Sequence, residues 1–257
     1  MKFTFYKYQG TGNDFVIIDN RHLHFPKQDT ALVAKICDRR FGVGADGLLL
    51  LENNPTADFT MVYYNSDGNI STMCGNGGRC IVHFAQFLEI ITENVIFEAL
   101  DGMHKGKVIG DWVSLKMNNV ESIKISENYS FLNTGSPHHV EMVNNLKDYD
   151  VFTHGRSIRH NLYGKDGANI NFVEQLAADT FSVRTYERGV EAETLSCGTG
   201  VTAVAIAMFE RGKTSERKVT LHSPGGKLQV RFNKSASVYN DVFLEGPATQ
   251  VFKGIWP

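Results

Sequence analysis

Two cysteines in this chain of 257 residues stand in matching local contexts. Cys74 and Cys197 each precede a Gly-x-Gly, and an apolar pattern with helical spacing follows both. At the N-terminus of a helix, unpaired backbone N–H groups and the positive end of the dipole favour a thiolate and can hold an anion. A lone cysteine is most often a small buried hydrophobe, which is the prediction for Cys37 and Cys80. Two cysteines in equivalent places favour a chemical role instead.

Two thiols on opposite sides of one carbon atom could invert its configuration. One thiolate would remove the α-proton of an amino acid while the other thiol delivers a proton from behind. Because that hydrogen is a very weak acid, the charge that develops on the carboxylate needs fixed N–H donors in a dry site. Such general-base work gains most when the thiol pKa lies near ambient pH. The pattern therefore predicts racemase or epimerase chemistry without pyridoxal phosphate or metal.

The cysteine motif belongs to a longer internal repeat. Thr11-Gly12 returns as Thr134-Gly135 and Cys74 returns as Cys197, in each case 123 residues later (197 minus 74). We interpret this as two similar halves, residues 1–119 with Cys74 and residues 120–247 with Cys197, and expect a strand at about 248–257 to return to the first half. No Pro- or Ser-rich linker separates the halves, so we expect the active site in the cleft between them.

Each half repeats the same predicted order of elements: a short helix, two strands, the Cys-Gly-x-Gly turn with its helix, and further strands. The central helices carry apolar residues at i, i+3, i+4 and i+7, and the second is apolar almost all round, which predicts burial. The fold class is α+β, with each half an antiparallel sheet wrapped around a central helix. The expected elements span 30–40, 47–51, 59–64, 95–98 and 112–117 in the first half, and 148–160, 169–174, 181–186, 219–222, 228–232 and 238–244 in the second.

Composition excludes several classes of protein. The formal net charge of −2 argues against nucleic acid as a partner, because phosphate binding needs a basic surface. The longest nearly apolar stretch, Val201–Phe209, is far shorter than a membrane span, so no membrane association is expected. The N-terminus lacks an apolar signal core, which makes the cytoplasm the default location.

Two glycine-rich stretches and the cysteine spacing need their own interpretation. Residues 42–47 match GxGxxG, but a helix-like stretch precedes them and a strand-like one follows, the reverse of a dinucleotide site. Residues 75–79 lack the Lys-Ser/Thr of a P-loop. There is no CxxC or HExxH pattern, and five residues separate Cys74 from Cys80, a poor zinc spacing, so no metal site is predicted.

Five motifs in order closely resemble the diaminopimelate epimerase family, from Phe3 to about Phe252. They are Gly10-Thr11-Gly12-Asn13-Asp14-Phe15, Tyr64-Asn65-Ser66-Asp67-Gly68, Cys74-Gly75-Asn76-Gly77-Gly78-Arg79-Cys80, Tyr186-Glu187-Arg188-Gly189 and Cys197-Gly198-Thr199-Gly200. The resemblance implies an enzyme without cofactor that interconverts LL- and meso-2,6-diaminopimelate, on the route to lysine and peptidoglycan. It also implies a cytosolic homodimer whose two domains close over the substrate.

The resemblance also implies roles for individual residues. Cys74 and Cys197 would be the acid/base pair, and Glu187 and His138 would tune their pKa values. The other expected contacts are with the substrate. The reacting carboxylate would be cradled by the backbone of Gly75, Asn76, Gly198 and Thr199. The rest of the substrate would be bound by Asn13, Asn65, Ser136, Asn169, Glu187 and Arg188, with Arg188 on the distal carboxylate.

The sequence departs from the usual pattern of the family in three ways. Ser136 stands where an Asn is usual, and Gly47 stands where some members have a Gln. The stretch between Arg188 and Cys197 is one residue longer than the commonest pattern.

Alternative functions stay open at this point. The nearest is a cofactor-independent racemase of another amino acid, such as histidine, on the same fold. A rival of another class is a non-catalytic protein that binds a metabolite or metal, with ordinary unreactive thiols. The proline-racemase-like and phenazine-isomerase-like folds are plausible relatives.

Overall fold

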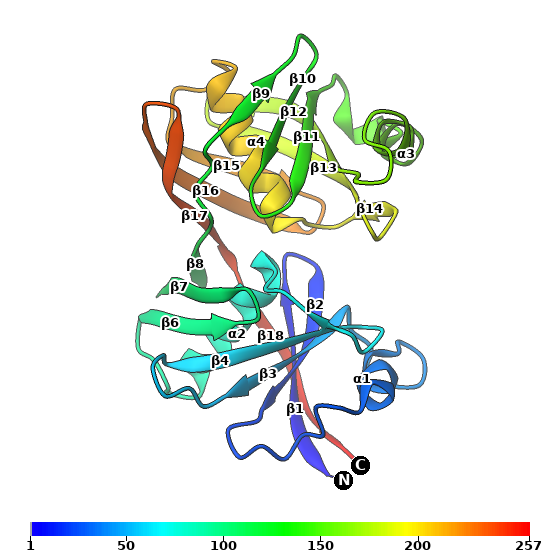
Figure 1. Cartoon of the computed structure of the whole chain (residues 1–257), viewed down its shortest axis with the longest axis vertical. Helices are drawn as coiled ribbons and strands as arrows, with labels where there is room; N and C mark the ends of the chain where they lie inside the picture. The colour runs from blue at the N-terminus through cyan, green and yellow to red at the C-terminus, as the bar shows by residue number, and fades with distance from the viewer. Residues whose placement is uncertain (1) are drawn as a thin grey trace. The chain divides into compact units, whose positions relative to one another are not determined.

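The computed structural model describes residues 2–257 and divides into two compact units (Figure 1). Unit 1 runs to Leu115 and resumes at Gly246–Pro257, and unit 2 comprises Lys116–Glu245. These contacts divide the chain after residues 115 and 245, whereas the internal repeat suggests divisions near 119 and 247. Among residues 2–257, none of the helices combines the length and the apolar content needed to cross a bilayer.

Unit 1 contains two helices and most of the N-terminal strands. Its elements are β1 (Phe3–Gly10), β2 (Asn13–Asp19), α1 (Thr30–Cys37), β3 (Gly47–Glu52), β4 (Phe59–Asn65), β5 (Ile70–Ser71), α2 (Gly75–Phe87), β6 (Asn94–Ala99), β7 (Gly102–Ile109), β8 (Trp112–Lys116) and the C-terminal β18 (Thr249–Trp256). β18 pairs antiparallel with β1, from Phe3 opposite Trp256 to Gln9 opposite Thr249.

Unit 2 repeats this order of helices and strands. Its elements are β9 (Ile123–Ile125), β10 (Tyr129–Asn133), β11 (Pro137–Met142), a 3-10 turn (Leu146–Asp148), α3 (Val151–Asn161), β12 (Asn169–Ala177), β13 (Thr180–Glu187), β14 (Ala192–Thr194), α4 (Gly198–Glu210), β15 (Lys218–Ser223), β16 (Gly226–Ser235) and β17 (Val238–Pro247). α4 starts 123 residues after α2, which is the offset of the sequence motifs.

The strand pairings of the two units also correspond. In unit 1, β2 runs parallel to β3 and β4 runs parallel to β6, while β3 and β4 are antiparallel. In unit 2, β11–β12 and β13–β15 are the parallel pairs and β12–β13 is antiparallel. A helix lies in the connection of every parallel pair, as a crossover requires. The α+β class is confirmed. The expected antiparallel sheets also contain these parallel pairs, because the crossovers return the chain in the same direction.

Burial identifies the helix at the centre of each unit. Every residue of α4 from Gly200 to Met208 is buried, as its apolar surface on all sides requires, and Figure 1 shows α4 among the strands of its unit. α2 is buried along its first eight residues and at Phe84 and Ala85. The two central helices therefore hold their first turns, and the cysteines before them, in fixed positions.

Candidate active site: two cysteine-capped helix ends

Cys74 is the N-cap residue of α2. Its backbone is extended, with φ −105° and ψ 148°, and its sulfur accepts a hydrogen bond from the Gly77 N–H at 3.2 Å. A Cβ atom on Gly77 would lie 3.2 Å from the same sulfur, so the third residue of the helix has to stay small. The Cys-Gly-x-Gly pattern thus provides a backbone donor for the sulfur, which favours the thiolate.

The side chains of Asn76 and Asn13 meet at this helix end. Asn76 Nδ2 donates to Asn13 Oδ1 at 3.2 Å, and Asn13 Nδ2 donates to Asp46 Oδ2 at 2.6 Å. Asn13 reaches the helix because β1 and β2 form a tight hairpin, with Thr11 and Gly12 both at positive φ. Three of the predicted site residues, Cys74, Asn76 and Asn13, are therefore brought together.

Arg79 is completely buried beneath the same turn, and sequence reasoning gave it no role. Its guanidinium donates to Gly75 O at 3.2 Å, to Thr11 Oγ1 at 3.1 Å and to Asn76 Oδ1 at 3.0 Å. Burial lowers its pKa to about 10, against the opposing effect of Cys80 and Cys74. Arg79 therefore stays charged at neutral pH, and its charge attracts a thiolate at Cys74.

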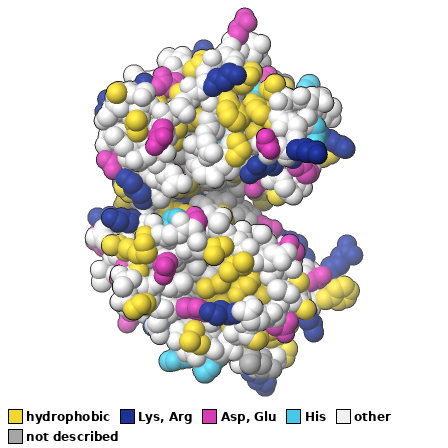
Figure 2. Space-filling view, viewed as in Figure 1, with side chains coloured by type: hydrophobic (Ala, Val, Ile, Leu, Met, Phe, Trp, Pro, Cys, Tyr) yellow, Lys and Arg dark blue, Asp and Glu magenta, His cyan; other side chains and the backbone are white. Residues whose placement is uncertain are grey.

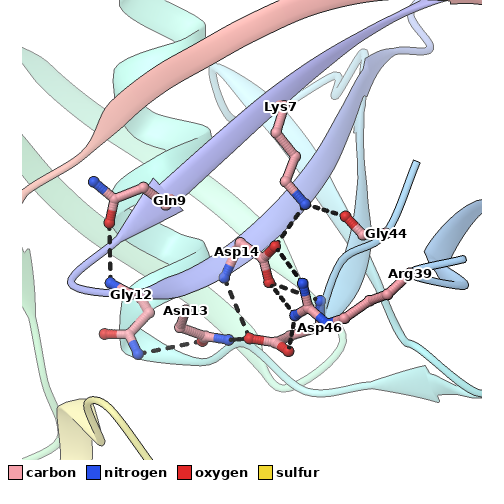
Figure 3. Close-up of polar contacts among 9 residues, drawn as sticks. Lys7, Gln9, Gly12, Asn13, Asp14, Arg39, Gly44 and Asp46 are labelled. Atoms are coloured by element: carbon pink, nitrogen blue, oxygen red, sulfur yellow. Dashed lines mark hydrogen bonds and ion pairs between the residues drawn. The ribbon is translucent and has the colours of Figure 1, made fainter. Parts of the chain in front are cut away.

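An ionic cluster holds Asp46, the hydrogen-bond partner of Asn13 (Figure 3). Arg39 Nη2 lies 2.7 Å from both Asp14 Oδ1 and Asp46 Oδ1, and Lys7 Nζ bonds Asp14 Oδ2 at 2.6 Å. Lys7 also donates to Gly44 O. Burial alone would raise the pKa of Asp14, but the hydrogen bonds from Arg39 and Lys7 outweigh it and lower the pKa to about 2. The cluster fixes Asp46, and Asp46 orients the Asn13 amide.

Asn65 lies at the end of β4 rather than in this cluster. Its N–H donates to Asn69 O at 2.9 Å and its carbonyl accepts from Gly68 N at 3.0 Å, which closes a turn. Opposite Asn65 in β3 stands Gly47, where an added Cβ would lie 2.6 Å from Tyr63 Cε2 and from Tyr64 O. This crowding explains why Gly47 carries no side chain in this protein.

Cys197 is the N-cap residue of α4, but its sulfur contacts a side-chain hydroxyl rather than the backbone of the helix. The cap has φ −121° and ψ 111°, and the side chain makes no hydrogen bond to the N–H groups of the helix. Instead Cys197 Sγ lies 3.5 Å from the hydroxyl of Thr199. Thr134 Oγ1 donates to Thr199 O at 2.8 Å and so holds the first turn of α4.

Ser136 lies next to Thr199 at the centre of a polar cluster. Its Oγ is 3.2 Å from Thr199 Oγ1, 3.0 Å from His138 Nε2 and 3.1 Å from Asn169 Nδ2, which donates to it. Ser136 thus joins three other predicted site residues, although it is one of the departures from the family pattern.

His138 is fully buried behind Ser136. Burial, with a smaller effect of the Arg188 charge, lowers its pKa to about 3, so the ring is neutral at physiological pH. Asn171 Nδ2 lies 3.2 Å from His138 Nδ1. Sequence reasoning missed Asn171, although an Asn in the apolar run of β12 is the kind of buried polar residue that needs a specific partner.

Glu187 and Arg188 follow at the end of β13. Glu187 Oε2 accepts from Thr194 Oγ1 at 2.8 Å, and the Arg188 N–H donates to Asn169 Oδ1 at 2.9 Å. The Arg188 side chain is exposed and donates to Asp166 O at 2.8 Å. The stretch between Arg188 and Cys197 includes the turn between β13 and β14, where Gly189 and Glu191 have positive φ. Cys197 nevertheless keeps its place as the N-cap.

The two remaining cysteines lie in the core. Cys37 and Cys80 are at most 3% exposed, and burial raises the pKa of each to about 12. The prediction that these two are packing residues is confirmed. The thiol chemistry available to the chain is therefore concentrated at Cys74 and Cys197, each with a hydrogen-bond donor near its sulfur and the N–H groups of a helix end beside it.

Comparison with known proteins identifies the family. The sequence profile described as diaminopimelate epimerase matches residues 5–121 and 130–251. A protein of Flavobacterium psychrophilum named diaminopimelate epimerase is 60% identical over 96% of this chain and 98% of its own length. The protein of that name from Chlorobaculum tepidum is 44% identical over 95% of this chain and 98% of its own length.

Solved structures with low sequence identity share the fold. A phenazine biosynthesis protein of the PhzF family from Bacillus anthracis superposes with a TM-score of 0.80 at 13% identity, covering 100% of this chain and 99% of that one. A hydroxyproline epimerase from Agrobacterium vitis gives a TM-score of 0.70 at 14% identity, covering 99% and 92%. Together with the profile match and the close relatives, these findings show that the chain is an isomerase that belongs to the diaminopimelate epimerase family.

Proposed function

We propose that this protein interconverts LL- and meso-2,6-diaminopimelate, in the synthesis of lysine and peptidoglycan precursors. The names of the close relatives support the substrate. The observation that carries the proposal is that Cys74 and Cys197 cap the two equivalent helices α2 and α4. Each helix end can offer N–H groups of its first turn to a carboxylate, and each cysteine can act as an acid or a base beside it.

The proposed mechanism uses both thiols on one carbon. The thiolate of one cysteine takes the Cα proton and becomes a thiol, and the electron pair of the broken C–H bond moves into the adjacent carboxylate. The thiol of the other cysteine then gives its proton to the opposite face of Cα and becomes the thiolate. The N–H groups of Gly75 and Asn76, with those of Gly198 and Thr199, stabilise the carboxylate as charge develops on it. No cofactor takes part in this scheme.

Recognition of the distal amino-acid head is assigned to polar side chains of the same motifs. The exposed guanidinium of Arg188 suits bidentate capture of the distal carboxylate. Asn169 is held in orientation by the Arg188 N–H, and Asn13 by Asp46, so both amides can offer fixed contacts. We assign Asn65, Ser136 and Glu187 to the same binding surface.

We further propose that the protein is a cytoplasmic homodimer. Two catalytic thiols must stay reduced, which suits a reducing compartment. Hydrophobic side chains reach the surface in clusters (Figure 2), and a groove of unit 1 is lined by Phe5, Phe41, Phe252, Ile255 and Trp256. Phe41 is 82% exposed and Ile255 is 69% exposed, so covering this groove with a second copy would stabilise a dimer. Sedimentation velocity would show a species of twice the chain mass, and a monomer at micromolar concentration would refute the dimer.

The reaction is tested by incubating the protein with LL-diaminopimelate in deuterated water, without added cofactor and with a chelator. We expect deuterium at one Cα together with formation of the meso isomer. A panel of L-amino acids that includes histidine and proline tests the rival racemases. Exchange with another amino acid but not with diaminopimelate would overturn the substrate, and no exchange with any of them would overturn the chemistry.

A further inference from the structure

A line of hydrogen-bonding side chains within unit 2 leads to the sulfur of Cys197. It runs from Asn171 through His138, Ser136 and Thr199. We infer that every hydrogen bond of this relay points toward Cys197 Sγ, so that the relay stabilises the thiolate form of Cys197 through the Thr199 hydroxyl. The role of the relay in catalysis rests on the proposed function, to which it adds three positioning residues, Asn171, His138 and Ser136.

The direction of the relay starts with the amide of Asn171. Its Nδ2 donates to His139 O at 2.8 Å, and its Oδ1 accepts from Thr185 Oγ1 at 3.0 Å. The amide cannot be turned over, because its oxygen would then face the carbonyl oxygen of His139, which only accepts. The atom that faces His138 Nδ1 at 3.2 Å is therefore a donor. A neutral imidazole carries one proton, and here it must be on Nε2.

Ser136 determines the direction of the next hydrogen bond, the one to Thr199. Its Oγ lies 3.0 Å from His138 Nε2, which donates, and 3.1 Å from Asn169 Nδ2, which also donates. The Asn169 amide is oriented by the Arg188 N–H on its Oδ1, at 2.9 Å. A serine hydroxyl has two acceptor sites and one proton. With both sites filled, that proton goes to Thr199 Oγ1, 3.2 Å away.

Thr199 completes the relay. Its hydroxyl accepts from Ser136, and its own proton is left to point at Cys197 Sγ, 3.5 Å away. A donor that faces sulfur stabilises the thiolate over the thiol, and aligned hydrogen bonds strengthen one another in a dry interior. The buried His138 ring is neutral across the working pH range, because burial lowers its pKa to about 3, and the direction therefore does not reverse.

The test is a spectroscopic titration of the Cys197 thiolate at 240 nm in a Cys74→Ala background without substrate. Cys37 and Cys80 do not interfere below pH 10, since the pKa of each is raised to about 12. We expect Thr199→Val to raise the Cys197 midpoint by about one pH unit, because a hydrogen bond to a charged acceptor is lost. Ser136→Ala should raise the midpoint by a smaller amount, and Thr199→Ser should restore it.

Thr202→Val is the matched control, because Thr202 is a buried hydroxyl of the same helix that donates to Gly198 O outside the relay. It should leave the midpoint unchanged. Midpoints that do not move in Thr199→Val and Ser136→Ala, or that move equally in Thr202→Val, would overturn the relay. Circular dichroism identifies any variant that fails to fold, and Ser136→Ala and Thr199→Ser then still decide the result. Because no substrate is present, a failed relay is distinguishable from a failed epimerase assignment.

Discussion

At the two cysteine-capped helix ends, equivalent residues form hydrogen bonds that run in opposite directions. The offset of 123 residues pairs Asn13 with Ser136, Asn76 with Thr199 and Asp46 with Asn169. In unit 1 the hydrogen bonds run from Asn76 to Asn13 to Asp46, away from the helix end and into a carboxylate. In unit 2 they run from Asn169 through Ser136 to Thr199, toward the helix end and its sulfur.

The groups that stabilise a thiolate at Cys74 and at Cys197 differ accordingly. Cys74 receives a backbone N–H and has the buried charge of Arg79 nearby, whereas the position equivalent to Arg79 is the neutral Thr202. Cys197 makes no cap bond to backbone N–H and lies against a side-chain hydroxyl instead. The repeat thus preserves the placement of the two thiols, while charge acts on one and a relay of neutral groups acts on the other.

Removing either sulfur should have the largest effect on catalysis. We expect Cys74→Ala and Cys197→Ala each to lower kcat/KM for epimerisation by about 10³-fold, because each removes one partner in proton transfer. Cys37→Ala, in the core of unit 1, should keep kcat/KM within a few-fold. The measurement is the rate of meso-diaminopimelate formation. Full activity in either active-site variant would show that the two ends are not a working pair.

Arg79→Met tests the contribution of the buried charge at the helix end of unit 1. The variant leaves Gly75 O, Thr11 Oγ1 and Asn76 Oδ1 without their buried donor, so we expect the free energy of unfolding to fall by about 3 kcal/mol. Thr202→Val at the equivalent position should cost about 1 kcal/mol. Urea unfolding of both variants gives the two values. Equal losses would mean that the buried charge contributes nothing particular to unit 1.

Acid should weaken unit 1 through its ionic cluster. The pKa of Asp14 is about 2 in the folded protein and 3.8 in its ordinary state, so its stabilising effect is present above pH 4 and is lost as the pH falls toward 2. We expect Asp14→Asn to lower the free energy of unfolding at pH 7 by about 1–2 kcal/mol. The gap between the two proteins should close between pH 4 and pH 2. A gap independent of pH would show that packing rather than charge holds the cluster.

His138 should show the smallest response to pH. Nitrogen-15 NMR of the labelled ring is expected to report a neutral imidazole with its proton on Nε2 from pH 5 to pH 9, since its pKa is lowered to about 3. The exposed His22 and His24 provide internal references in the same spectrum. A proton on Nδ1, or a titration of His138 near pH 6, would contradict the direction of the relay.

The sequence predicted the features that depend on pattern. The repeat and the all-apolar run of α4 gave two α+β halves with buried central helices, and the five motifs gave the family. The parallel strand pairs were missed because strand direction depends on where a crossover helix returns the chain. The assignment of site residues to catalytic and binding roles stays a prediction that the experiments above test.

Contacts of single buried polar groups could not be predicted in the same way. Arginine is almost never fully buried unless it is paired, so nothing in the sequence marked Arg79 as the residue that ties α2 to the Thr11 turn. Likewise the neutral state of His138 follows from its burial, and the position of its ring proton follows from Asn171, which lies 33 residues away in the chain. These properties arise from tertiary distances that local spacing does not encode.

The pairing of β18 with β1 has a consequence for biosynthesis. Unit 2 is one continuous segment, whereas unit 1 needs the last residues of the chain to cover the edge of β1. On the ribosome, unit 2 can therefore fold while unit 1 still waits for its final strand. A stop codon before Thr249 would leave the first unit with an open sheet edge, prone to aggregation, and the second intact.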